Sequence, residues 1–85
     1  MEPITLIIVD DHPLFREGVR NIIDAEDDLS VLAEGLSGDQ ALQLVRELRP
    51  RVALIDVNMP NMNGIQVTRQ VTAERLGTSI VLLTA

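Results

Sequence analysis

Short apolar runs alternate along the chain with stretches in which apolar residues recur at helical spacing. Four runs, at residues 4–9, 31–33, 52–55 and 80–83, are too short for buried helices and predict strands. Between them, a period near 3.6 predicts amphipathic helices. Their apolar stripes are Phe15, Val19, Ile22 and Ile23 in the first helix, Ala41, Leu44, Val45 and Leu48 in the second, and Val67 and Val71 in a weaker third.

Residues at the helix ends support these boundaries. Pro13 stands in the first turn of the first helix, where a proline is well tolerated. Ser37 followed by Gln40 predicts a capping box at the start of the second helix, in which each side chain bonds to the other residue's backbone N–H. Pro50 closes this helix, and turn-forming residues at 58–64 precede the third.

The predicted order of elements is β-α-β-α-β-α-β in one domain covering residues 1–85. Alternation of short strands with helices indicates an α/β fold with a parallel sheet and right-handed crossovers. We expect a flavodoxin-like, doubly wound sheet, in which strand one lies between strands two and three and strand four lies beside strand three. The run at 31–33 is interrupted by Glu34, which indicates a strand near an edge.

Polar side chains follow the predicted strands at one end of the sheet. Asp10 and Asp11 come directly after strand one, Asp56 after strand three and Thr84 after strand four. Strands one and three are neighbours where the winding direction reverses, so the three carboxylates are expected to converge. Clustered like charges need a counter-ion, and hard oxygen ligands favour Mg²⁺. Such a site suits phosphoryl transfer, with Asp56 as the nucleophile and the Thr84 hydroxyl as a donor to a phosphoryl oxygen.

Simpler interpretations exist for single residues of this region. Asp11 alone could cap the following helix. His12 could complete an Asp-Asp-His metal triplet, but consecutive side chains point in different directions, and a histidine before Pro13 is more simply a turn residue at the lip of the site. Met59 and Met62 are expected to pack within their loop rather than bind a ligand.

Composition narrows the classes of function. The net charge of −6 and a pI near 4.5 argue against direct binding of nucleic acid. The absence of cysteine excludes disulfides and thiolate metal sites and fits a reducing cytoplasm. No apolar segment approaches the roughly 20 residues of a membrane span. Residues 1–10 lack the basic leader and cleavage site of a signal peptide.

Two segments carry a specific resemblance: Val-Asp-Asp-His-Pro-Leu-Phe-Arg-Glu-Gly at 9–18 and Leu-Ile-Asp-Val-Asn-Met-Pro-Asn-Met-Asn-Gly at 54–64. Across all 85 residues the chain resembles the CheY-like receiver domain of two-component response regulators. The first segment resembles the branch that carries a LuxR-type helix-turn-helix output domain. The second resembles the phosphorylation loop, with Pro60 and Gly64 as the residues that shape its sharp turn.

The resemblance implies roles for the residues at the strand ends. Asp56 is the expected phosphoacceptor, which takes its phosphoryl group from a sensor histidine kinase. Asp11 and Asp56 would provide side-chain ligands to Mg²⁺, and Asn58 would provide its backbone carbonyl. Asp10 would act mainly through metal-bound water, and Thr84 matches the switch hydroxyl of the family.

The chain departs from the family pattern after the fourth strand. Family members continue with a fourth helix, a fifth strand ending in a lysine that binds the phosphoryl group, and a fifth helix, whereas all seven basic residues here are arginines. We therefore expect a fragment of a longer protein, in which DNA is bound only by an output domain outside this chain. The uncovered strand at 79–84 and an incompletely covered sheet face predict self-association.

Three other functions are alternatives. A fold-only binding or dimerisation module would keep the fold without phosphotransfer. An aspartyl-phosphate phosphatase would need a carboxylate two residues after its nucleophile, whereas Asn58 stands at that position after Asp56. A flavin-binding module would need backbone donors for the flavin phosphate in the loop where this chain has Asp10 and Asp11.

Overall fold

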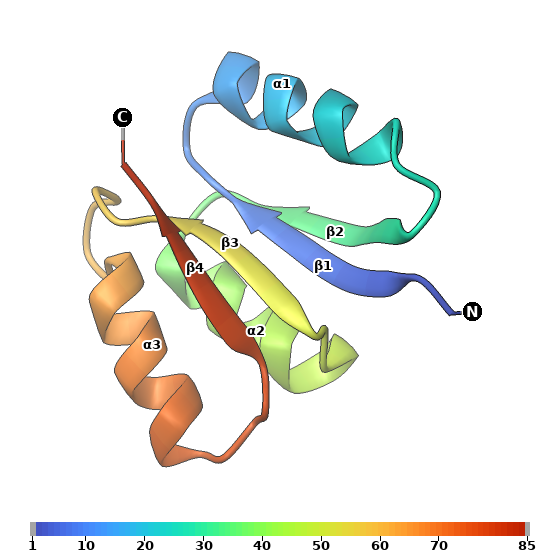
Figure 1. Ribbon diagram of the computed structural model, residues 1–85. Coiled ribbons are helices and arrows are strands. Elements are labelled where there is room, and N and C mark those ends of the chain that lie inside the picture. Colours follow the sequence, from blue (N-terminus) through green and yellow to red (C-terminus); the bar gives the residue numbers. More distant parts are fainter. Residues whose placement is uncertain (1, 85) are drawn as a thin grey trace.

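The computed structural model of the protein describes residues 2–84. Four strands and three helices alternate along the chain: β1 (Ile4–Val9), α1 (Pro13–Asp24), β2 (Leu29–Gly35), α2 (Gly38–Leu48), β3 (Val52–Asp56), α3 (Gly64–Ala73) and β4 (Ser79–Leu83). All strand pairs are parallel, in the order β2-β1-β3-β4. Helix α1 lies on one face of the sheet, and α2 and α3 lie on the other (Figure 1).

This arrangement confirms the predicted α/β fold. Strand β1 lies between β2 and β3, β4 lies beside β3, and β2 is an edge strand, as expected. Within the described residues, no helix has the length and apolar character that a membrane crossing requires.

Alternate side chains of β1 enter two separate apolar clusters. Ile7 and Val9 pack with α2 and α3, whereas Leu6 and Ile8 pack with Ile23 of α1. The first cluster is completed by Ala41, Leu42, Val45, Ala53, Ile55, Met59, Val67, Val71 and Leu76. Because both faces of β1 are covered, its sequence is a continuous apolar run rather than an alternating one.

The predicted apolar stripe of α1 is only partly buried. Val19 and Ile23 pack against the sheet, but Phe15 is exposed and Ile22 is 71% exposed. Helical spacing groups these positions on one side of the helix. However, a single helix lying on a sheet buries only the narrow line of residues that touches the strands, and the described part of the chain provides no second helix on this face.

In helix α2, the buried residues and the hydrogen bonds of the N-terminal cap differ in part from the prediction. Leu48, in its last turn, is exposed, and Leu42 is buried because α2 contacts α3 as well as the sheet. The Ser37 side chain accepts a hydrogen bond from the Gln40 N–H at 3.2 Å, as predicted. The Gln40 side chain, however, accepts from the N–H of Leu36 at 2.7 Å, so the predicted capping box is half formed.

Helix α3 has the complete capping box. The Asn63 side chain accepts from the Gln66 N–H at 3.0 Å, and the Gln66 side chain accepts from the Asn63 N–H at 2.9 Å. This pair was not predicted, because Asn63 stands in a run of turn-forming residues where a helix cap and a loop residue look alike in the sequence.

Candidate metal centre

Asp10 and Asp56 lie next to each other at the carboxyl ends of the two central strands. Strands β1 and β3 are in parallel register up to the residue before each aspartate. Both aspartates are buried, with 2% and 3% exposure. Asp11 follows in the loop before α1 and is partly exposed. One ligand atom from each of these aspartates and from His12 lies within 4.8 Å of all the others.

Backbone hydrogen bonds orient the two buried carboxylates. The N–H of His12 donates to Oδ1 of Asp10 at 2.6 Å, and the N–H of Asn58 donates to Oδ1 of Asp56 at 2.9 Å. Each donor lies two residues beyond its acceptor, which is the geometry of an Asx turn. The same carboxylates therefore shape the turns that leave the strands and face the shared site.

The imidazole of His12 lies against all three carboxylates. Its Nδ1 is 3.0 Å from Oδ1 of Asp10, 3.0 Å from Oδ1 of Asp11 and 3.8 Å from Oδ2 of Asp56. The hydrogen bond to Asp10 and the charge of Asp11 raise the pKa of His12 above its usual value. The side chain is 65% exposed, as expected at the lip of the site, but its nitrogen also offers a fourth ligand atom.

Negative charge in this cluster is only partly compensated. Among residues 2–84, His12 is the one side chain that forms an ion pair with Asp10, Asp11 or Asp56. Two of the three carboxylates are buried, and buried like charges raise each other's energy unless a cation is present. Carboxylate oxygens in a partly open site are ligands that Mg²⁺ prefers, with water in its other positions. The donor set therefore fits Mg²⁺.

Nearly the whole chain matches one known family. Residues 6–85 match the model of the response regulator receiver domain. The chain belongs to this family. Its members are signalling domains of two-component systems. Over 66 residues the chain is 47% identical to the transcriptional regulatory protein DegU of Brevibacillus brevis, a match that covers 78% of this chain and 28% of DegU.

Solved structures of related receiver domains have the same CheY-like fold. The signal receiver domain of the response regulator NarL from Mycobacterium tuberculosis has a TM-score of 0.97 and 39% identity, with 100% of this chain and 68% of that chain covered. A LuxR-family two-component response regulator from Aurantimonas has a TM-score of 0.90 and 31% identity, with 98% and 59% covered. The resemblance to LuxR-type response regulators is thus confirmed, and the chain spans about a quarter of DegU.

Two further predicted site residues of the receiver domain lie at the same end of the sheet. Asn58 is in the turn after β3, with its N–H bonded to Asp56. The carbonyl of Leu83 accepts from the N–H of Val57 at 3.0 Å, which places the end of β4 beside the residue after Asp56. Thr84 follows directly and is exposed.

The loop after β3 turns at a different residue from the one expected. Asn61 has the left-handed backbone, with φ 66°, whereas Gly64 is not in that region. Gly64 is instead required by close packing, because a Cβ there would press on a β4 leucine and the backbone carbonyl of Asp56. Met59 and Met62 were expected to pack within their loop, but Met59 is buried in the main apolar cluster and Met62 packs against it.

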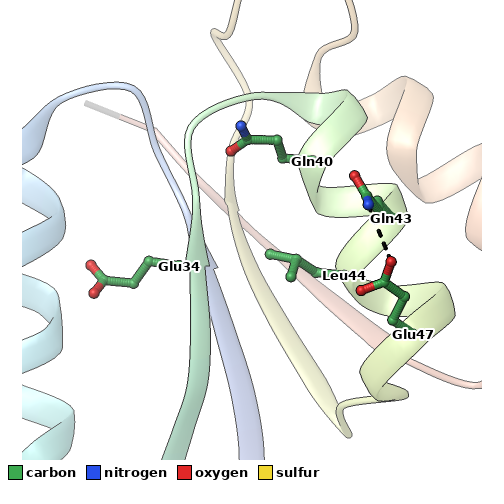
Figure 2. A pocket seen from close by; sticks show the side chains of 5 residues that line it. All are labelled: Glu34, Gln40, Gln43, Leu44 and Glu47. Atoms are coloured by element: carbon green, nitrogen blue, oxygen red, sulfur yellow. Dashed lines mark hydrogen bonds between the residues drawn. The ribbon is translucent and has the colours of Figure 1, made fainter.

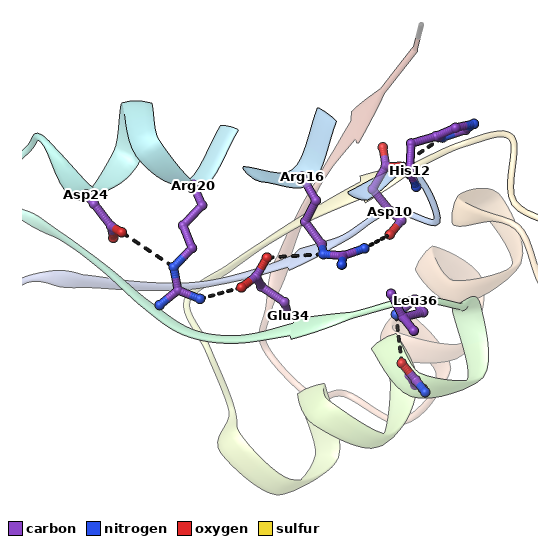
Figure 3. A network of polar contacts seen from close by, with 8 residues as sticks. Asp10, His12, Arg16, Arg20, Asp24, Glu34 and Leu36 are labelled. Atoms are coloured by element: carbon purple, nitrogen blue, oxygen red, sulfur yellow. Dashed lines mark hydrogen bonds and ion pairs between the residues drawn. The ribbon is translucent and has the colours of Figure 1, made fainter. Parts of the chain in front are cut away.

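Arg16 reaches the receiver site from α1 and was not predicted. Its Nη1 donates to the backbone carbonyl of Asp10 at 2.7 Å, and its Nε donates to Glu34 of β2 at 3.1 Å (Figure 3). Nothing in the sequence separates Arg16 from other helix arginines, because the contact depends on how α1 lies across β2.

A groove of about 310 Å³ lies elsewhere, between β2 and α2. Figure 2 shows that Glu34 lines it from β2, with its carboxylate pointing toward α1, and that the other four lining side chains come from α2. Gln43 donates to Glu47 at 3.1 Å, and Gln40 is bonded to the backbone of Leu36. The polar groups that line this groove are thus mostly bonded to near neighbours, and we assign it no function.

Proposed function

We propose that Asp56 is the phosphoacceptor of a response regulator, taking a phosphoryl group from a sensor histidine kinase with Mg²⁺ bound beside it. The observation that carries this proposal is the buried Asp56 carboxylate at the end of β3, with Asp10 and Asp11 beside it. Family membership supports it. Such a centre carries a signal as a covalent mark, and its only chemistry is its own phosphorylation and dephosphorylation.

In the transfer step, an oxygen of Asp56 attacks the phosphorus of the kinase phosphohistidine. The new O–P bond forms as the P–N bond breaks, the electron pair returns to the kinase imidazole, and Asp56 becomes an acyl phosphate. Bound Mg²⁺ would neutralise charge on the phosphoryl oxygens. The N–H of Asn58 holds Oδ1 of Asp56, which favours one orientation of the carboxylate toward the phosphorus.

We assign the metal ligands by combining the family pattern with this geometry. Asp11 and Asp56 would bind Mg²⁺ through their carboxylates and Asn58 through its carbonyl, while Asp10 would bind mainly through metal-bound water. The close approach of the carboxylates supports this assignment. Thr84 would donate its hydroxyl to a phosphoryl oxygen, which is supported by the position of the end of β4.

In the whole protein, phosphorylation of Asp56 would control a DNA-binding output domain outside these 85 residues, in the cytoplasm. The relatives support this proposal, since DegU is a transcriptional regulatory protein and the Aurantimonas relative is a LuxR-family response regulator. A fourth helix, a fifth strand with its lysine and a fifth helix would complete the receiver domain. The coverage of 68% of the NarL receiver domain is consistent with this proposal.

The experiment that tests the phosphoacceptor is labelling by a small acyl phosphate, followed by intact-mass spectrometry. We expect the whole protein to gain a single phosphoryl group only when Mg²⁺ is present, and Asp56→Asn to gain none. Asp39→Asn is the matched control, because Asp39 is an exposed carboxylate in the first turn of α2. Labelling of Asp56→Asn at the level of the parent would show that the nucleophile is elsewhere.

For the 85-residue chain alone, a fold-only binding or dimerisation module is a second candidate function. Exposed Val81 and Leu82 on the edge strand β4 favour it. The chain also contains no lysine to offset phosphoryl charge, so its labelling is expected to be slower than that of the whole protein. A chain that associates with itself but is never labelled under any of these conditions would support the second candidate.

A further inference from the structure

We infer that Arg16 is a positioning residue for the metal centre, which holds the Asp10–Asp11 turn in its binding geometry while anchored to Glu34 of β2. This inference rests on the proposed function of the site. Arg16 forms no hydrogen bond to the carboxylate oxygens of Asp10, Asp11 or Asp56, and it acts through the backbone carbonyl of Asp10.

The contacts of Arg16 join three separate elements. Its Nη1 donates to the carbonyl of Asp10 at 2.7 Å, and its Nε donates to Oε1 of Glu34 at 3.1 Å. The side chains of Arg16 and Glu34 are 17% and 28% exposed, so the pair is only partly shielded from water. The other carboxylate oxygen of Glu34 accepts from Arg20, which is also bonded to Asp24 (Figure 3).

The carbonyl that Arg16 binds belongs to the peptide linking Asp10 to Asp11. Because a peptide unit is planar, fixing its oxygen also fixes the direction in which Asp11 leaves the strand. The N–H of Asp10 donates to the carbonyl of Gly35 at 3.1 Å. The backbone of Asp10 is therefore held on both sides, by Gly35 directly and by Glu34 through Arg16. Glu34 and Gly35 are the last two residues of β2.

An arginine suits this task better than a lysine. The guanidinium presents several N–H donors in a rigid plane, so it can bind a carbonyl and a carboxylate in different directions at the same time. A lysine ammonium at position 16 would keep the charge, but its flexible stem would not hold both partners in one fixed arrangement. Arg16 thus fixes the position, relative to β2, of the turn that carries the metal ligands.

Because Arg16 is positively charged, a positioning role and a purely electrostatic role predict opposite changes in Mg²⁺ affinity when the residue is replaced. Removing a positive charge near a cation site strengthens cation binding by Coulomb's law alone. Removing a residue that orients ligands weakens it, by about tenfold or more for groups that hold metal ligands in place. A role confined to stabilising the fold would lower the unfolding temperature and leave the Mg²⁺ affinity of the folded protein unchanged.

The test is an NMR titration of the protein with Mg²⁺, together with amide hydrogen exchange of His12 in the metal-free protein. The His12 amide is bonded to the Asp10 carboxylate at 2.6 Å, so its exchange rate reports the geometry of the turn without metal. We expect Arg16→Gln to bind Mg²⁺ about tenfold more weakly and to exchange this amide faster. Arg20→Gln loses the same charge from the same helix but no contact to Asp10, so it should bind Mg²⁺ at least as tightly as the parent.

Arg16→Lys provides a second variant that retains the charge and should show an intermediate loss of affinity. The inference is overturned if Arg16→Gln binds Mg²⁺ as tightly as Arg20→Gln and its His12 amide exchanges at the parental rate. Failure of the proposed function looks different. In that case the parent shows no Mg²⁺ shifts at the aspartates, or Asp11→Ala binds as tightly as the parent, while the His12 exchange rate still decides the role of Arg16.

Discussion

The two faces of the sheet are covered to different extents. On the two-helix face, α2 and α3 enclose the larger apolar cluster around Ile7 and Val9. On the one-helix face, α1 covers the smaller cluster around Leu6 and Ile8. The exposed side of α1 carries a shallow apolar groove of about 330 Å³ lined by Leu14, Phe15, Gly18, Val19 and Ile22.

The kinds of contact also differ between the faces. The two-helix face is held mainly by apolar packing, which stabilises the fold but carries no site residue from a helix. On the one-helix face, α1 is joined to β2 by the ion pairs of Arg16 and Arg20 with Glu34. The comparison teaches that apolar burial and helix contacts to the acidic site are separated in this domain: the larger apolar cluster lies on one face, and the helix residue that contacts the backbone of Asp10 lies on the other.

The largest expected effect compares neighbouring residues of β1 that point to opposite faces. Ile7 and Ile8 are both fully buried. We expect both Ile7→Ala and Ile8→Ala to lower the free energy of unfolding by about 2–5 kcal/mol, with Ile7→Ala at the upper end. The cavity left at Ile7 is enclosed by two helices, whereas a single helix, α1, covers Ile8 and can close part of the cavity by a small shift. Urea unfolding followed by circular dichroism measures the difference, and a larger loss for Ile8→Ala would contradict the contrast.

A pair of glycines sharpens the same comparison. Gly38 starts α2 on the two-helix face, and a Cβ there would collide with the backbone of Met62. Gly18 lies on the exposed side of α1, with nothing near its missing Cβ. We expect Gly38→Ala to lower stability by about 1–3 kcal/mol, and Gly18→Ala to raise it by up to about 1 kcal/mol through helix propensity. Thermal unfolding of both variants should therefore shift in opposite directions.

Self-association tests whether the incompletely covered surfaces bind a second copy of the chain. We expect the 85-residue chain to associate at micromolar concentrations through β4 or the exposed side of α1. Val81→Lys or Leu14→Lys should weaken association about tenfold, which is of the order of the free energy of burying one apolar side chain. Ile65→Lys, on the exposed surface of α3, is the control. A stable monomer of the parent in light scattering would contradict this expectation and show that the edge strand β4 does not pair with another chain.

The smallest effect concerns the ion pair that joins α2 to α3. Arg46 and Gln70 lower the pKa of Glu74 to about 2, from an ordinary value of 4.5, by hydrogen bonding to its carboxylate. A lowered pKa in the folded state means that this stabilisation is fully present above pH 4.5 and is lost as the pH falls through about 2. The parent should therefore lose slightly more stability than Glu74→Gln over this range. Acid titration at constant temperature measures the difference, and parallel curves would show that the exposed pair contributes nothing.

The sequence by itself determined the strand ends and therefore the acidic site. Local spacing distinguishes short apolar runs from helices, and parallel strands place their carboxyl ends at one edge. For this reason the convergence of Asp10, Asp11 and Asp56 could be predicted from the sequence alone. The same reasoning predicted the strand order, because few topologies are compatible with alternating strands and helices.

Only the tertiary structure decided which parts of each helix are buried and what supports the site. Ile22 belongs to the predicted apolar stripe of α1 but is exposed, whereas Leu42 lies outside the predicted stripe of α2 but is buried. Burial depends on the neighbours that a helix meets as well as on its own period. The contact between Arg16 and Glu34 joins residues 18 positions apart, and the close approach at Gly38 depends on the path of another loop. Such contacts arise when separate elements pack together, so the local pattern that forms each element contains no signal for them.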